Sequence, residues 1–135
     1  MKGSTPLRRW RELTREEIAC AQESLRAWGY PRELDADDID SSIWARWGPD
    51  ALVWWMPVGF DTYSVHVCFA PSARQRTGLE FRRFLQGLDL IGEFLGGKRL
   101  VALPIDNTRA LIHDLGLRAG WELEGDMLVR ELQEG

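Results

Sequence analysis

Residues 104–125 constrain the fold of this 135-residue chain more than any other stretch. They read in order as the end of an apolar strand, a capping residue, an amphipathic helix, a glycine and a strand that opens with an aromatic residue. Asp106 or Asn107 can cap the first free N–H groups of the helix, and Gly116 can take the left-handed conformation that ends it. A helical apolar stripe lies between them, at Leu111, Ile112 and Leu115.

The same stretch resembles the C-terminal motif of the GNAT superfamily, the acetyl-CoA-dependent N-acyltransferases. In that motif an asparagine opens the last long helix, an alanine follows three residues later, and the helix runs into Gly-Phe-x-x-x-Gly. The matching positions here are Asn107, Ala110, Gly120-Trp121 and Gly125. In particular, the chain resembles compact GNAT-like proteins of phages. In those proteins the glycine-rich loop that binds the cofactor has often lost its glycines, and a Val-His precedes the loop, as Val65-His66 does here.

Length, charge and cysteine content exclude several classes of protein. A chain of 135 residues with 44% hydrophobic and 28% charged residues predicts one ordinary globular domain. The formal net charge of −4 argues against a general binder of nucleic acid or of an anionic membrane. No run approaches the roughly 20 apolar residues of a membrane span. Cys20 and Cys68 lie in apolar surroundings and are expected to be buried free thiols in a reducing bacterial cytoplasm.

The pattern of elements predicts an α/β domain with a mixed, mostly antiparallel sheet flanked by helices. Residues 1–13 form a basic arm that is poorly anchored, and residues 14–42 form a helical part, in which a Thr14-to-Glu17 capping box opens a helix that ends at Gly29. Residues 43–132 form the GNAT-like core. Its expected elements are a three-stranded meander (43–47, 51–58, 62–69), a helix (77–94), a strand (99–103), the helix that begins at Asn107, and a hairpin (121–124, 127–132).

The resemblance implies a site for acetyl-CoA, because GNAT proteins hold its pyrophosphate on the backbone of a (Gln/Arg)-x-x-Gly-x-(Gly/Ala) loop before the central helix. Glycine is needed there because a side chain would keep the phosphates away from the amides. Aligned on Arg74, the small positions become Thr77 and Leu79; aligned on Gln75, Gly78 is kept and the last position becomes Glu80. Both alignments lose a glycine, and a cluster of arginines can partly replace it.

The cofactor-binding residues implied by this resemblance come from the strand before the loop, from the loop itself and from the start of the last helix. The strand before the loop would pair its backbone with the pantetheine arm. The whole set is Val67, Cys68, Phe69, Ala70, Arg74, Gln75, Arg76, Thr77, Gly78 and Asn107.

Two histidines are the candidate catalytic residues. His66 lies on the strand before the loop, where GNAT proteins often place groups that deprotonate the amine, and a neutral imidazole suits that role. The tyrosine that many GNAT enzymes use to protonate the thiolate is replaced by Asp114, so the neighbouring His113 is the candidate acid. The structural alternatives are a His66 packed between sheet and helix and a His113 on the surface. No metal site is expected, since two histidines lack ligand spacing.

Two main functions remain open at this point, and a non-catalytic acyl-CoA sensor that binds without transfer falls between them. The first is acetyl transfer from acetyl-CoA to a primary amine, on a small molecule, a protein N-terminus or a lysine. The second is an inactive GNAT-fold assembly protein, for example a phage virion component that contacts other structural subunits. The eroded loop and the tryptophans of residues 44–55 favour the second, and either protein can form a homo-oligomer.

Overall fold

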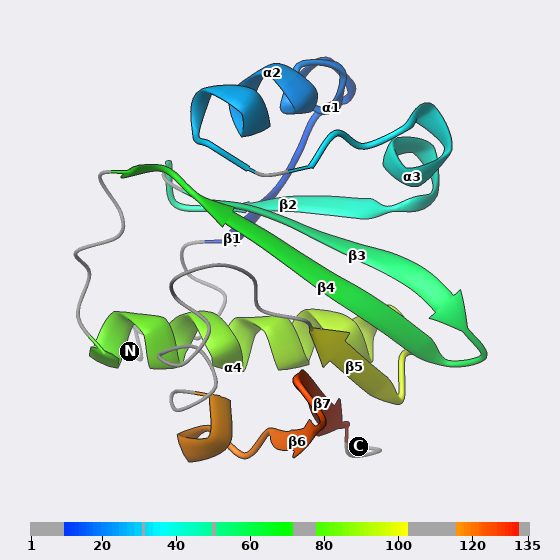
Figure 1. The fold of residues 1–135 in the computed structure, drawn as a ribbon, viewed down its shortest axis with the longest axis vertical. Helices are drawn as coiled ribbons and strands as arrows, with labels where there is room; N and C mark the ends of the chain where they lie inside the picture. Colours follow the sequence, from blue (N-terminus) through cyan, green and yellow to red (C-terminus); the bar gives the residue numbers. More distant parts are fainter. Residues whose placement is uncertain (1–9, 31, 50, 72–77, 103–115, 133–135) are drawn as a thin grey trace.

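The computed structural model describes residues 10–30, 32–49, 51–71, 78–102 and 116–132. Three layers make up the molecule: short helices above, a twisted sheet in the middle and one long helix below (Figure 1). The upper helices are α1 (Arg15–Ala19), α2 (Ala21–Ala27) and α3 (Ala36–Ser41), and the lower one is α4 (Gly78–Phe94). The strands are β1 (Trp10–Glu12), β2 (Ile43–Trp47), β3 (Ala51–Gly59), β4 (Thr62–Phe69), β5 (Arg99–Ala102), β6 (Glu122–Glu124) and β7 (Met127–Glu131).

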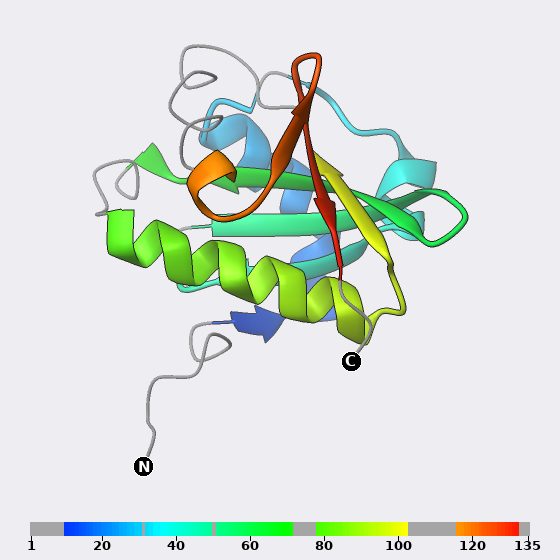
Figure 2. The same cartoon turned by 90° about the horizontal axis from the view of Figure 1, so that it is seen from below.

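The sheet has seven strands in the order β1-β2-β3-β4-β5-β7-β6. Every neighbouring pair is antiparallel except β4 and β5, which run parallel. A parallel neighbour needs a crossover connection, and α4 supplies it by running beneath the sheet (Figure 2). The predicted meander, central helix and C-terminal hairpin are therefore confirmed.

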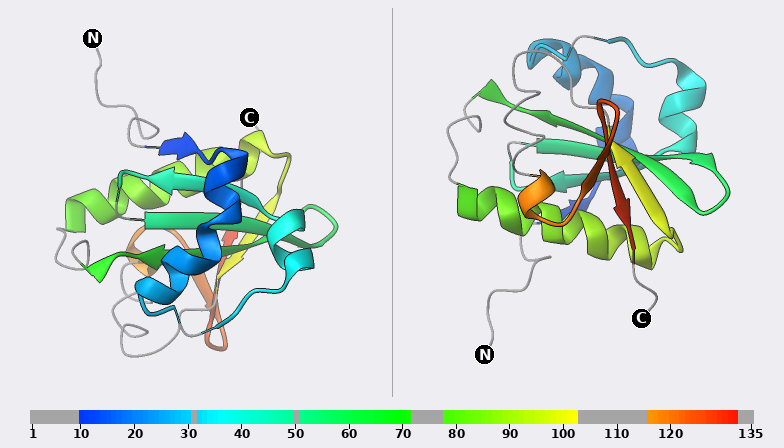
Figure 3. Two further views of the ribbon diagram at one scale, coloured as in Figure 1. Left: turned by 90° about the horizontal axis from the view of Figure 1, so that it is seen from above. Right: turned by 60° about the horizontal axis from the view of Figure 1, so that its bottom comes forward.

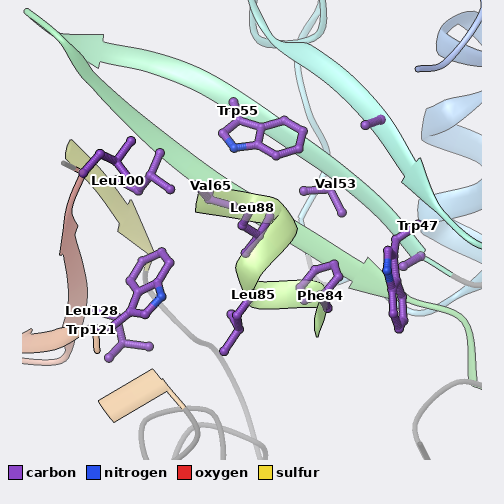
Figure 4. Packing of buried hydrophobic residues seen from close by; sticks show 13 residues of the cluster. Trp47, Val53, Trp55, Val65, Phe84, Leu85, Leu88, Leu100, Trp121 and Leu128 are labelled. Atoms are coloured by element: carbon purple, nitrogen blue, oxygen red, sulfur yellow. The ribbon is translucent and has the colours of Figure 1, made fainter. Parts of the chain in front are cut away.

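The middle of the sheet is buried on both faces, because successive apolar side chains of β3 point alternately into two hydrophobic cores. Val53 and Trp55 face α4, where they join Phe84 and Leu88 in the larger core (Figure 4). Leu52 and Trp54 face the opposite way and pack with Leu25 of α2. Helices α1 and α2 cross the sheet on that upper face (Figure 3, left). One face of the sheet is thus covered by α4 and the other by the N-terminal helices.

Residues 10–12, the described end of the predicted basic arm, are anchored in the fold. Trp10–Glu12 is an edge strand that pairs with β2, with Trp10 opposite Trp47. The Trp10 ring also stacks on Phe84 of α4, with 5.3 Å between ring centroids. Pairing between distant segments cannot be seen in local periodicity, which explains why the strand was missed.

The predicted helix up to Gly29 is split in two, although its capping box is confirmed. The Thr14 hydroxyl accepts the N–H of Glu17 and the Glu17 carboxylate accepts the N–H of Thr14. At Cys20 the N–H is shared between the carbonyls of Glu16 and Glu17, and the backbone leaves helical geometry before α2 begins. Cys20 is exposed, contrary to expectation, because it lies at this turn; Cys68 is buried, and both are free thiols.

The predicted left-handed C-cap at Gly116 is wrong, because Gly116 itself is helical. Residues 116–118 are helical, and the left-handed residue is Gly120, with φ of +98°. The N–H of Trp121 bonds to the carbonyl of Gly116 and that of Gly120 to Leu117, which is a Schellman motif. Gly116 is small for another reason: a Cβ there would press on the Leu128 side chain of β7. Across the described ranges, no helix is long and apolar enough to cross a membrane.

Candidate active site

Strand β4 continues beyond the point where its pairing with β5 stops. The parallel register links Thr62 to Arg99 and ends with Ser64 opposite Val101, while β4 runs on to Phe69. Figure 1 shows the two strands diverging from there. On the other edge, β3 pairs with β4 as far as Phe69. Within the described part of the chain, residues 65–67 have no strand partner on this second edge, so their N–H and C=O groups can receive an extended ligand.

His66 lies on this outer part of β4, on the face that the N-terminal helices cover. Ser64, His66 and Cys68 alternate with Val65 and Val67 and share that face. The Nε2 atom of His66 is 2.8 Å from the hydroxyl oxygen of Ser64. Nε2 accepts from the hydroxyl in one tautomer and donates to it in the other. Burial, and secondly the charge of Arg32, lowers the pKa of His66 to about 4, so the imidazole is neutral at pH 7.

A row of aromatic rings supports the imidazole from the side of β3. Trp44, Trp54 and His66 stand opposite one another on three adjacent strands. The ring of Trp54 stacks on Trp44 at 4.7 Å and on His66 at 5.3 Å, with planes within 21° and 11°. The indole N–H of Trp44 donates to the carbonyl of Ile39 at 3.1 Å, which fixes the far end of the row. The orientation of the His66 ring is therefore held by stacked side chains.

The loop between α2 and α3 covers the same face and brings two more polar side chains to it. A Schellman motif ends α2, in which Gly29 has φ of +82° and the N–H of Tyr30 bonds to the carbonyl of Leu25 at 2.9 Å. This turn places the Tyr30 ring edge-on against Trp54, with 5.3 Å between centroids. Burial raises the pKa of Tyr30, and the charge of Arg32 acts against that rise. Tyr30 and His66 thus both contact Trp54, and the charge of Arg32 affects the pKa of each.

The sequence matches no protein-family model and no curated protein. Solved structures, in contrast, match nearly the whole chain. A GNAT-superfamily phosphinothricin acetyltransferase from Sinorhizobium meliloti, in complex with acetyl-CoA, is 14% identical, with a TM-score of 0.68, over 93% of this chain and 89% of that one. A GNAT-family acetyltransferase from Streptococcus pneumoniae is 11% identical, with a TM-score of 0.66, over 91% and 98%. The ribosomal-protein-S18-alanine N-acetyltransferase from Escherichia coli is 14% identical, with a TM-score of 0.66, over 93% and 94%.

The chain has the GNAT fold. At these identities the likeness establishes the architecture, and it extends to the N-terminal helices as well as the predicted core. The resemblance that the sequence motif carried is therefore confirmed at the level of the fold.

The GNAT fold distributes the residues predicted to bind a cofactor over both faces of β4. Val67 and Phe69 pack toward the core on the α4 side, whereas Cys68 is buried on the opposite side. Ala70 is also buried, just past the strand, and Gly78 is the first residue of α4. The remaining predicted positions lie outside the described residues: Arg74, Gln75, Arg76, Thr77, Asn107 and His113.

Three residues of this GNAT-fold site were not identified from the sequence. Ser64 is two residues before His66, so the period of a strand could have paired them. Tyr30 and Arg32 lie far from His66 along the chain, in a loop whose position depends on how α2 packs on the sheet. No sequence signal indicates that juxtaposition.

Proposed function

We propose that this protein is an N-acetyltransferase that moves the acetyl group of acetyl-CoA to a primary amine. The observation that carries the proposal is the position of a neutral imidazole on the part of β4 that extends past the β5 pairing. That arrangement puts a proton acceptor on the same strand as a backbone edge suited to the pantetheine arm. The GNAT fold of the chain and the acetyl-CoA complex of a structural neighbour support the choice of cofactor.

The residues present fit acetyl-CoA at two points. Backbone N–H and C=O groups of Val67, Cys68, Phe69 and Ala70 would hold the pantetheine arm where β4 runs past the end of its pairing with β5. The N-terminus of the 17-residue helix α4, at Gly78, would face the diphosphate with the N–H groups of its first turn. Acetyl-CoA supplies an acyl thioester there, and the predicted roles of Arg74, Gln75, Arg76, Thr77 and Asn107 in holding it remain proposals.

His66 would take the proton that the amine must lose as its nitrogen bonds to the acetyl carbon. The proton goes directly to Nε2 of His66, or it goes to the Ser64 hydroxyl. In the second route the hydroxyl passes its own proton to Nε2, which is 2.8 Å away. Because the pKa of His66 is about 4, the imidazole is free to accept but holds the proton weakly. His113 would return a proton to the leaving thiolate.

Binding and turnover test separate parts of the proposal. Acetyl-CoA at a hundred times its dissociation constant should stabilise the protein by about 2.7 kcal/mol, which a thermal-shift titration detects, with ATP as the anionic control. His66→Gln should keep that shift and lower the rate of CoA release with an amine panel about 10²-fold or more. A protein that millimolar acetyl-CoA does not stabilise is not an acetyltransferase, and full turnover by His66→Gln removes His66 as the base.

We propose an assembly protein, such as a component of a phage particle, as the second candidate. Phe60 and Phe94 are 92% and 89% exposed, which is unusual for phenylalanine. They lie at one end of the molecule, since the Asp61 carbonyl accepts the N–H groups of Lys98 and Arg99 and so joins the β3–β4 turn to the segment after α4. Light scattering should then find a stable oligomer that the Phe60→Ser/Phe94→Ser variant dissociates, and a monomeric wild type would exclude this function.

A further inference from the structure

We infer that the amine acceptor carries a carboxylate and that Arg32 binds it. The inference rests on the proposed acetyl transfer and names the class of its acceptor, an amino acid or an amine with a comparable acidic group. Two observations carry it, the anchoring of the residues that flank Arg32 and the pairing of the acids around it, and the effect of its charge on the pKa of His66 supports it.

Two described residues that flank Arg32, Tyr30 and Leu34, are each held in place. Before it, Tyr30 is tied to Leu25 through the backbone and packs against Trp54. After it, the side-chain amide of Gln22 bonds twice to Leu34, donating to its carbonyl at 2.5 Å and accepting its N–H at 3.2 Å. An arginine in such a loop loses little backbone entropy when it binds an anion, and preorganisation of this kind favours binding.

The acids nearest to Arg32 in sequence are already engaged. Glu33 makes a two-pronged ion pair with Arg26, at 2.6 Å and 3.1 Å. Asp35 caps α3 by accepting the N–H of Asp38 at 2.9 Å. Among the residues that the structure describes, no carboxylate pairs with Arg32, which is exposed. Its guanidinium is therefore available to a carboxylate from solution, which it can bind through two parallel hydrogen bonds.

The charge of Arg32 acts on the proposed base. After burial, it is the second cause that lowers the pKa of His66, and it also opposes the rise of the pKa of Tyr30. A carboxylate bound to Arg32 would neutralise that charge and leave burial as the remaining cause. His66 would then hold a proton more strongly when an acceptor is bound than when the site is empty. One contact thus orients the amine and strengthens the base.

The test compares amines that differ only in the carboxylate. Steady-state CoA release is measured with ω-amino acids of two to six carbons and with the alkylamines of the same carbon number. We expect kcat/KM at least tenfold higher for the best amino acid than for its alkylamine, as a charge-assisted contact implies. Arg32→Gln should abolish that preference through the KM of the amine and leave the KM of acetyl-CoA unchanged. Arg32→Lys should keep part of it, and Arg15→Gln, an exposed change of the same charge on α1, should keep all of it.

The outcomes distinguish the inference from the function on which it rests. Turnover without preference for the amino acids, or a preference that survives Arg32→Gln, overturns the inference and leaves the transferase intact. If no amine is acetylated, the proposed function fails, and the Arg32 site is then decided by NMR of the His66 ring. Addition of the ω-amino acids should shift that ring and raise its pKa in the wild type but not in Arg32→Gln; an unchanged ring in the wild type overturns the site.

Discussion

Arg130 on β7 reaches Asp89 on α4, with 3.0 Å between Nε and Oδ2, and its Nη1 donates to the carbonyl of Gly120 at 3.1 Å. One side chain thus joins the long helix, the last hairpin and the turn that precedes it. The second carboxylate oxygen of Asp89 is buried without a hydrogen-bond partner. Burial therefore outweighs the attraction of Arg130 and raises the pKa of Asp89 to about 6.

Asp89 is expected to make the protein less stable as pH rises from about 4 to 6. Its pKa is higher in the folded state than in the unfolded chain, so the folded state binds more protons over that range, and their loss favours unfolding. Asp89→Asn cannot titrate and should become more stable relative to wild type as pH increases through this window. Urea unfolding of both proteins at pH 4, 5, 6 and 7 measures the difference, and Arg130→Gln should move the wild-type transition to higher pH. A difference that is independent of pH would contradict this prediction.

His66 is expected to have the opposite effect over almost the same range. Its pKa of about 4 lies below its ordinary value, so the unfolded chain binds the extra proton, and stability is lost as pH falls from about 6.5 to 4. His66→Gln should remove this part of the acid sensitivity. NMR titration of the ring should give a midpoint near 4 in the wild type. A midpoint near 6.5 would mean that the ring is open to water and the stacked environment of Trp54 is wrong.

Thr14 is expected to contribute to stability through its capping box. Thr14→Ala removes the hydroxyl that accepts the Glu17 N–H and should lower the free energy of unfolding by about 1 kcal/mol. Thr14→Ser keeps the acceptor and serves as the matched control. Chemical denaturation of the three proteins decides the matter, and equal stability of Ala and Ser variants would show that the cap contributes nothing.

Gly87 of α4 is expected to reverse the usual effect of replacing a helical glycine. Alanine in a helix interior normally stabilises by about 1 kcal/mol, but a Cβ at Gly87 would overlap the indole of Trp10. Overpacking of that kind destabilises by about 1–3 kcal/mol. Gly87→Ala should therefore destabilise the wild type.

The coupling between Gly87 and Trp10 provides the control for that prediction. In a Trp10→Ala background the obstructing ring is absent, so Gly87→Ala should stabilise the protein by about 1 kcal/mol. A double-mutant cycle by denaturant unfolding measures both signs. If the substitution has the same effect in both backgrounds, β1 does not dock on α4 through Trp10.

Local sequence patterns predicted most of the helices and strands because glycines and turn residues mark where these elements end. Gly48 and the turn at residues 59–61 delimit the meander, and Gly96-Gly97 ends α4 as expected. The break at Cys20 has no such marker, since neither proline nor glycine is present there. Strand β1 was missed because its three residues are stabilised by partners from β2 and α4.

The candidate site was predictable only in part. His66 is a candidate because it lies on the strand before the loop, and the period of that strand puts it on one face with Ser64 and Cys68. Its environment depends on how α2 ends, because the Schellman turn at Gly29 decides where Tyr30 and Arg32 lie. The catalytic assignments and the cofactor contacts remain predictions for the experiments above.

The strand order has a consequence for how the molecule assembles. Strands β2, β3 and β4 are neighbours in the sheet in the order in which they occur in the chain, and short turns join them, whereas β1 is separated from β2 by α1, α2 and α3. Strand β5 can lie beside β4 only after the long α4 crossover has been made. Strand β7, which lies between β5 and β6, is the last strand of the chain. Local contacts form faster than distant ones, so during synthesis on the ribosome the meander should already be formed while the C-terminal hairpin is still being made.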